Sequence, residues 1–212
     1  MLGSLRPHTK AFTEAVARPF AAIGFPPTLF TLLGPLFALY AGFFILQEKF
    51  AEAFVLTLIA ISIDMFDGSV ARLQKKDSLF GNYFETMIDK VVEIILFISV
   101  AFLHPIAAIF ALAFSLLNSY AKPRVALVII TDNRDWPGLG EHSERMLLLL
   151  AGIFLSIFSF NYFGFPVLEA SLWLIAIIAF IGSAQRIFFA KKLIEEAEQK
   201  GNVLPYLKKS SK

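Results

Sequence analysis

Long apolar stretches separated by short polar segments run through most of the chain. Six of them have about the length that a helix needs to cross a membrane, roughly 20 residues. They cover residues 28–47, 51–74, 78–103, 106–121, 146–163 and 167–186. The pattern predicts an all-α integral membrane protein in which residues 1–212 form a single membrane domain, with six transmembrane helices in a bundle over residues 28–186.

A separate, shorter pattern precedes the first apolar stretch. Residues 9–23 repeat an apolar side chain every four positions, at Phe12, Val16 and Phe20, with charged residues between them. This spacing predicts an N-terminal amphipathic helix, which either lies in the membrane interface or packs on the bundle. Pro19 is expected to kink this helix or to end it early.

Basic residues gather on one side of the predicted bundle. Lysines and arginines precede the first span, follow every even-numbered span and fill the tail 187–212, whereas the opposite side has only Lys49. Positively charged loops stay in the cytosol. We therefore expect a multi-pass protein of the cell membrane with both termini in the cytosol. The tail is expected to be helical to Gln199, because Gly201 and Pro205 follow.

Composition agrees with a membrane protein. Hydrophobic residues make up 57% of the chain and charged residues 17%, and the mean hydropathy is +0.69. Soluble domains have about 25% charged residues, so a disordered chain, a fibrous repeat and a basic nucleic-acid-binding module are excluded. The chain has no cysteine, which excludes a disulfide framework, a thiol nucleophile and a cysteine-ligated metal. The first 25 residues lack the uninterrupted apolar core of a signal peptide.

Acidic residues interrupt the second and third predicted spans. These residues are Asp64, Asp67, Glu85, Asp89 and Glu93. A charge at the centre of a membrane costs about 3 kcal/mol on insertion scales, so the acids need either basic partners, such as Lys90 and Arg72, or cations in a cavity. The turn between the two spans is short, so the helices are expected to lie antiparallel with their acidic faces together. Oxygen ligands favour Mg²⁺, Mn²⁺ or Ca²⁺ over zinc.

Residues 64–89 form a longer motif, D-x2-D-G-x2-A-R-x8-G-x3-E-x3-D. This motif closely resembles the signature of the CDP-alcohol phosphotransferases, which are membrane enzymes that make phospholipid head groups. The signature has Asp where this chain has Glu85. The residues that match, with every spacing intact, are Asp64, Asp67, Gly68, Ala71, Arg72, Gly81 and Asp89.

The resemblance implies a catalytic mechanism and a set of site residues. Two divalent ions, Mg²⁺ or Mn²⁺, would be held by Asp64, Asp67, Glu85 and Asp89 and would bind the diphosphate of a CDP-linked lipid. Asp89 would also take the proton from an acceptor hydroxyl, whose oxygen attacks the phosphorus nearer the lipid and releases CMP. The nucleotide would lie against Thr28, Thr31, Gly68, Ala71, Arg72 and Gly81.

Two stretches at the cytosolic ends of the fourth and fifth spans resemble those of members that use inositol phosphate. They are Ser-Tyr-Ala-Lys-Pro-Arg at 119–124 and Gly-Glu-His-Ser-Glu-Arg at 140–145. Lys122, Arg124 and Arg145 would bind the acceptor phosphate, although the positive-inside rule alone also places basic residues here. Inositol phosphate is the leading acceptor, with glycerol 3-phosphate and serine as alternatives.

Two other functions stay open. Glu85 places its carboxylate about 1.5 Å further from the backbone than Asp would, which allows a catalytically silent family member. The buried acids alone would also suit a cation transporter or channel, but that function does not explain Gly68, Arg72 and Gly81 at their spacings. The resemblance further implies surrounding membrane lipid and a homodimer as partners.

Overall fold

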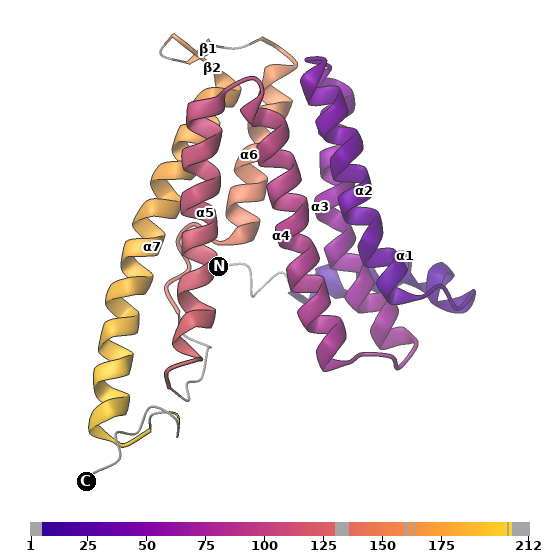
Figure 1. The fold of residues 1–212 in the computed structure, drawn as a ribbon. Helices are drawn as coiled ribbons and strands as arrows, with labels where there is room; N and C mark the ends of the chain where they lie inside the picture. Colours follow the sequence, from indigo (N-terminus) through magenta and orange to yellow (C-terminus); the bar gives the residue numbers. More distant parts are fainter. Residues whose placement is uncertain (1–5, 130–135, 160, 163, 203, 205–212) are drawn as a thin grey trace. The chain divides into compact units, whose positions relative to one another are not determined.

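The computed structural model describes most of the chain as helices. The backbone is described for residues 6–129, 136–159, 161–162, 164–202 and 204, and side chains are described within these ranges except at 6–12, 64, 65 and 162. The described helices are α1 (Arg6–Ala22), α2 (Pro27–Leu46), α3 (Phe50–Leu73), α4 (Leu79–Ala101), α5 (Pro105–Val125), α6 (His142–Ser156) and α7 (Val167–Gln199) (Figure 1). A two-stranded antiparallel hairpin, β1 (Asn161–Tyr162) with β2 (Phe165–Pro166), connects α6 to α7.

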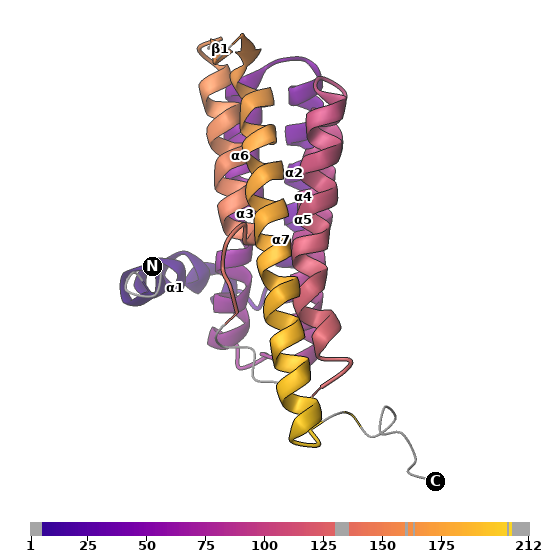
Figure 2. The ribbon, with the colours of Figure 1, turned by 90° about the vertical axis from the view of Figure 1, so that its left-hand side faces the viewer.

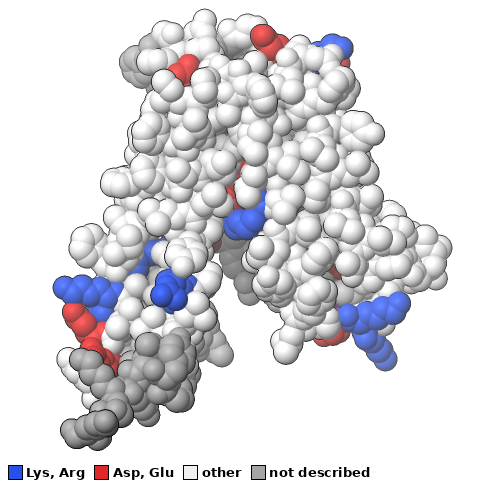
Figure 3. Space-filling view, viewed as in Figure 1, with Lys and Arg blue, Asp and Glu red and all other residues white. Residues whose placement is uncertain are grey.

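Four of the described helices are long and apolar enough to cross a membrane, namely α2, α3, α5 and α7. Helix α6 has only 15 residues, and α4 carries four charged residues in its middle, so neither meets the same criterion. Most of the surface in Figure 3 is uncharged, and large apolar side chains such as Leu39, Phe43 and Phe180 are more than half exposed. The structure therefore confirms a helical membrane protein, and the count of six spans stays a prediction.

The chain divides into two compact units, Met1–Leu103 and His104–Lys212. In the first unit α2 packs against α3 and α4, and α1 packs across the end of α3 (Figures 1 and 2). Small residues allow close helix packing: a side chain on Gly42 would overlap Ser99 of α4. Helix α1 runs through Pro19 and buries Ala17 against Phe30 and Val70. Of the two effects expected of Pro19, the early end is therefore wrong, and the kink stays a prediction.

In the second unit α7 lies between α5 and α6 (Figure 2). It is one helix of 33 residues, about 50 Å long at 1.5 Å per residue, so the predicted sixth span and the helical part of the tail are continuous. The helical tail to Gln199 is thereby confirmed. The expected fifth span, 146–163, ends too late. Helix α6 stops at Ser156 because the chain then turns into the hairpin, where Gly164 has a φ of +82°.

Candidate active site

A cavity of about 700 Å³ opens in the first unit, where the start of α2, the end of α3 and the start of α4 meet. Its wall contains all six residues that the family resemblance assigns to the nucleotide, namely Thr28, Thr31, Gly68, Ala71, Arg72 and Gly81. Of the predicted metal ligands whose side chains are described, Asp67 and Glu85 line the cavity as well. The fold thus gathers residues of three helices around one space large enough for a small ligand.

Hydrogen bonds from Thr31 and Gly68 help to hold Asp67 in the wall. Its side chain is almost fully buried, with 2% of its surface exposed. The Thr31 hydroxyl lies 2.7 Å from Oδ2, and the backbone N–H of Gly68 donates to Oδ1 over 2.6 Å. Hydrogen bonds to a charged acceptor are short and strong, so the orientation of this carboxylate is well defined.

Glu85 reaches across from α4 toward α3. A Cβ atom placed on Gly68 would lie 3.8 Å and 3.9 Å from the two carboxylate oxygens of Glu85, and 3.3 Å from Nη1 of Arg72. Any side chain at position 68 would therefore enter the space beside Glu85. The extra methylene of Glu85, compared with Asp, carries its carboxylate to this position.

The oxygen donors around this space fit a hard divalent cation. Asp67 and Glu85 supply carboxylates, the ligands that Mg²⁺ and Mn²⁺ prefer, and Gly68 leaves a gap beside them that a side chain would fill. The side chain of Asp64 lies outside the described residues, and Asp89 is half-buried on α4, one turn after Glu85. Among the side chains that are described, no three metal-binding groups come together, so the four-carboxylate site stays a prediction.

A cap at the start of α4 and an ion pair deeper in the helix stabilise it. Ser78 caps the helix, because its hydroxyl accepts a hydrogen bond of 3.0 Å from the N–H of Gly81. Deeper in the helix, the fully buried Glu93 pairs with Lys90, with 2.7 Å between Oε2 and Nζ. This pairing is one of the two explanations offered above for acids inside an apolar span, and it applies to Glu93.

Sequence reasoning missed some cavity residues. Lys76 adds a positive charge to the wall, and Phe80 and Phe84 add two stacked rings whose centroids lie 5.9 Å apart. The two phenylalanines could have been found from the sequence, because Phe80 and Phe84 are four positions apart and therefore lie on one face of a helix.

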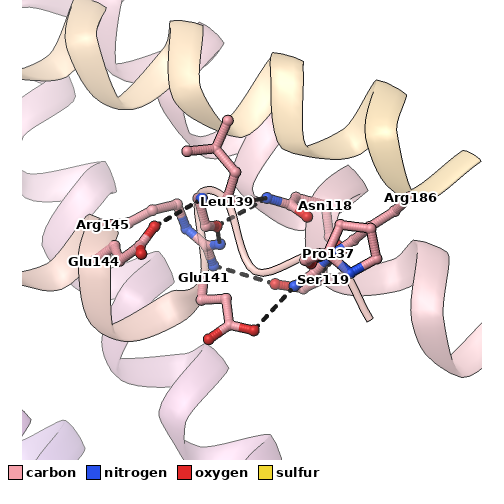
Figure 4. Close-up of polar contacts among 9 residues, drawn as sticks. Asn118, Ser119, Pro137, Leu139, Glu141, Glu144, Arg145 and Arg186 are labelled. Carbon is pink, nitrogen blue, oxygen red and sulfur yellow. Dashed lines mark hydrogen bonds and ion pairs between the residues drawn. The ribbon is translucent and has the colours of Figure 1, made fainter. Parts of the chain in front are cut away.

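The predicted acceptor residues lie in the second unit. Arg145 is fully buried. It donates hydrogen bonds to the carbonyl of Gly140 and, over 3.1 Å, to the hydroxyl of Ser119 (Figure 4). Ser119 precedes Lys122 by one turn of α5, so Arg145 is fixed close to that turn. Lys122 is half-buried and Arg124 is exposed. Their role in acceptor binding stays a prediction.

Two further polar residues share this network, and sequence reasoning missed both. Asn118 of α5 donates to the carbonyls of Leu139 and Gly140 over 3.1 Å and 2.8 Å (Figure 4). Arg186 of α7 is 7% exposed and donates to the carbonyl of Pro137 over 3.1 Å and to that of Asn118 over 2.8 Å. From the sequence, Arg186 was one more cytosolic charge and Asn118 one polar residue in an apolar span.

The first unit of this helical fold thus brings two acids, an arginine and two glycines of the motif to the wall of one cavity. Residues 25–182 match the profile of the family described as CDP-alcohol phosphatidyltransferase. The match covers well over half of the chain, and the chain belongs to this family.

Individual relatives agree with this assignment. Archaetidylinositol phosphate synthase of Pyrococcus horikoshii is 27% identical over 200 residues, which cover 92% of this chain and 99% of the relative. Phosphatidylinositol phosphate synthase of Streptomyces avermitilis is 29% identical over 215 residues, covering 92% and 85%. The crystal structure of Mycobacterium tuberculosis phosphatidylinositol phosphate synthase with CDP-DAG bound has a TM-score of 0.70 and 25% identity, over 84% of this chain and 92% of that one. The same enzyme has been solved in complex with manganese and citrate, with a TM-score of 0.68 and 24% identity.

Proposed function

We propose that this protein transfers the phospho-alcohol group of a CDP-linked lipid to a hydroxyl of inositol phosphate and releases CMP, as a step of phospholipid biosynthesis. The observation that carries the proposal is the cavity of the first unit, whose wall contains the residues that the family resemblance assigns to the nucleotide, together with Asp67 and Glu85. The family match over residues 25–182 supports the same reaction.

The chemistry follows from the residues of α3 and α4. Asp64, Asp67, Glu85 and Asp89 would hold two divalent ions, Mg²⁺ or Mn²⁺, which when bound neutralise the diphosphate of the donor. The hydroxyl oxygen of inositol phosphate attacks the phosphorus on the lipid side, and Asp89 takes the proton of that hydroxyl. The P–O bond to CMP breaks, and CMP leaves with the bonding electron pair.

Inositol phosphate is proposed as the acceptor because the relatives described above are named as synthases of inositol phosphate lipids. Lys122, Arg124 and Arg145 would bind its phosphate. Arginine offers a planar fork of donors that suits phosphate, and two of these residues lie on the last turn of α5. Glycerol 3-phosphate and serine are the competing acceptors.

The membrane arrangement is part of the proposal. We propose that all six helices from α2 to α7 cross the cell membrane and that α1 lies at its cytosolic surface, with both termini and the active site on the cytosolic side. The distribution of lysine and arginine along the chain supports this orientation. From the family resemblance we also propose that the protein forms a homodimer and is surrounded by membrane lipid.

The test is release of CMP by the purified protein in detergent, with CDP-diacylglycerol and Mg²⁺ or Mn²⁺. Separate reactions contain inositol 1-phosphate, glycerol 3-phosphate, serine or inositol. We expect release with inositol 1-phosphate and loss of release when EDTA removes the metal. Binding of the donor without release under any condition would indicate a silent member, for which Glu85 is the motivation. Absence of both release and donor binding in folded protein would favour the cation-site function.

A further inference from the structure

Thr31 makes a contact that its expected role as a border of the nucleotide does not require. It lies on α2, one turn after Pro27, and only 8% of its surface is exposed. Its hydroxyl oxygen is 2.7 Å from Oδ2 of Asp67 and 3.1 Å from the carbonyl oxygen of Pro27. The hydroxyl has one proton to donate. The carboxylate is the nearer and the charged acceptor, so it receives the stronger hydrogen bond.

The bond joins two helices at the cavity wall. Thr31 and Asp67 are 36 positions apart in the chain, whereas the N–H of Gly68, which also donates to Asp67, lies on the same helix as the carboxylate. A donor on α3 orients the carboxylate only relative to the helix that carries it. A donor on α2 fixes its plane relative to the cavity. A carboxylate has about four acceptor sites, so the hydrogen bonds from Thr31 and Gly68 are compatible with a bound cation.

We propose that Thr31 is a positioning residue for Asp67, whose hydroxyl holds the carboxylate in the orientation that binds a divalent cation. This inference rests on the proposed function, because it takes Asp67 to be a metal ligand. Partners that orient metal ligands contribute about 10-fold to 100-fold to metal affinity. Thr31 then acts on the metal through Asp67, and the nucleotide contact is secondary.

The chain offers matched variants for a test. Thr31→Val keeps the shape of the side chain and removes the hydroxyl, whereas Thr31→Ser keeps the hydroxyl. Thr28→Val is the control: Thr28 lies one turn earlier on α2, lines the same cavity and is exposed. No hydrogen bond of its side chain is found among the described residues. Binding of Mn²⁺ to each purified protein is measured by electron paramagnetic resonance, without donor or acceptor.

We expect Thr31→Val to weaken Mn²⁺ binding about 10-fold or more, and Thr31→Ser and Thr28→Val to stay within about threefold of the wild type. Unchanged Mn²⁺ affinity in Thr31→Val overturns the inference. Equal losses in Thr31→Val and Thr31→Ser also overturn it, because the hydroxyl would then not be the cause. If the wild type binds no Mn²⁺, the metal part of the proposed function fails first and this inference fails with it.

Discussion

Asn118 and Arg145 donate hydrogen bonds to the same acceptor, the backbone carbonyl oxygen of Gly140. Asn118 comes from α5 and Arg145 from α6, and the backbone carbonyl of Asn118 accepts in turn from Arg186 of α7. The connection before α6 therefore ties three helices of the second unit together (Figure 4). Buried polar groups such as these stabilise a fold only when they find partners, and the loop carbonyls supply them.

Replacing Asn118 by alanine tests this arrangement. The change removes both side-chain bonds to the loop and leaves the Leu139 carbonyl without its donor, and we expect a loss of about 2 kcal/mol in the free energy of unfolding. Thermal denaturation in detergent measures the effect. The control is Ser115→Ala, on the same helix, because the buried Ser115 hydroxyl has no hydrogen-bond partner among the described residues. An equally stable Asn118→Ala protein would contradict the structural role.

Gly182→Ala probes the close approach of the same loop to α7. A Cβ atom at this position would overlap the carbonyl oxygen of Leu139, which is backbone and cannot turn away. Overpacking of this kind costs about 1–3 kcal/mol, so the melting temperature should fall. Gly138→Ala is the control on the same loop, since its Cβ would meet only Glu141 at 3.5 Å, an ordinary contact. Similar melting temperatures for the two variants would show that the loop moves easily.

Gly68→Ala should separate stability from activity. Alanine is the better residue inside a helix by about 1 kcal/mol, and the nearest atom to the new Cβ is the flexible end of Arg72 at 3.3 Å. The fold should therefore be kept or slightly stabilised. The new methyl group enters the space beside Glu85, so the KM for CDP-diacylglycerol should rise about 10-fold or more. Unchanged KM with unchanged melting would exclude this space from the donor site.

Asp89→Asn addresses the proposed general base. The amide of asparagine cannot take the proton from the hydroxyl of the acceptor substrate. Loss of a general base lowers turnover by a factor of about 100 to 10,000. CMP release measures turnover, and binding of CDP-diacylglycerol should remain largely intact. The control is Asp77→Asn, an acid of the cavity wall in the turn before α4. A near-normal rate for Asp89→Asn would reject Asp89 as the base.

Much of the site could be predicted from the sequence. The motif over 64–89 has fixed spacings, and the family match confirms the class of enzyme that it indicates. The predicted convergence of the two helices is confirmed for Gly68 and Glu85, which face each other across α3 and α4. The order of apolar stretches also matched the helices, apart from the end of α6, where an uncharged segment forms a hairpin rather than a longer helix.

The sequence by itself determined the helices and the reaction class, because helical periodicity and motif spacing are properties of neighbouring residues. Only the tertiary structure decided which side chains from elsewhere in the chain form hydrogen bonds with the polar residues of the helices. The hydroxyl of Thr31 meets Asp67 from 36 positions away, and Arg186 meets the carbonyl of Asn118 from 68 positions away. Such hydrogen bonds depend on how helices pack, and a polar residue in an apolar stretch does not reveal its partner until the packing exists.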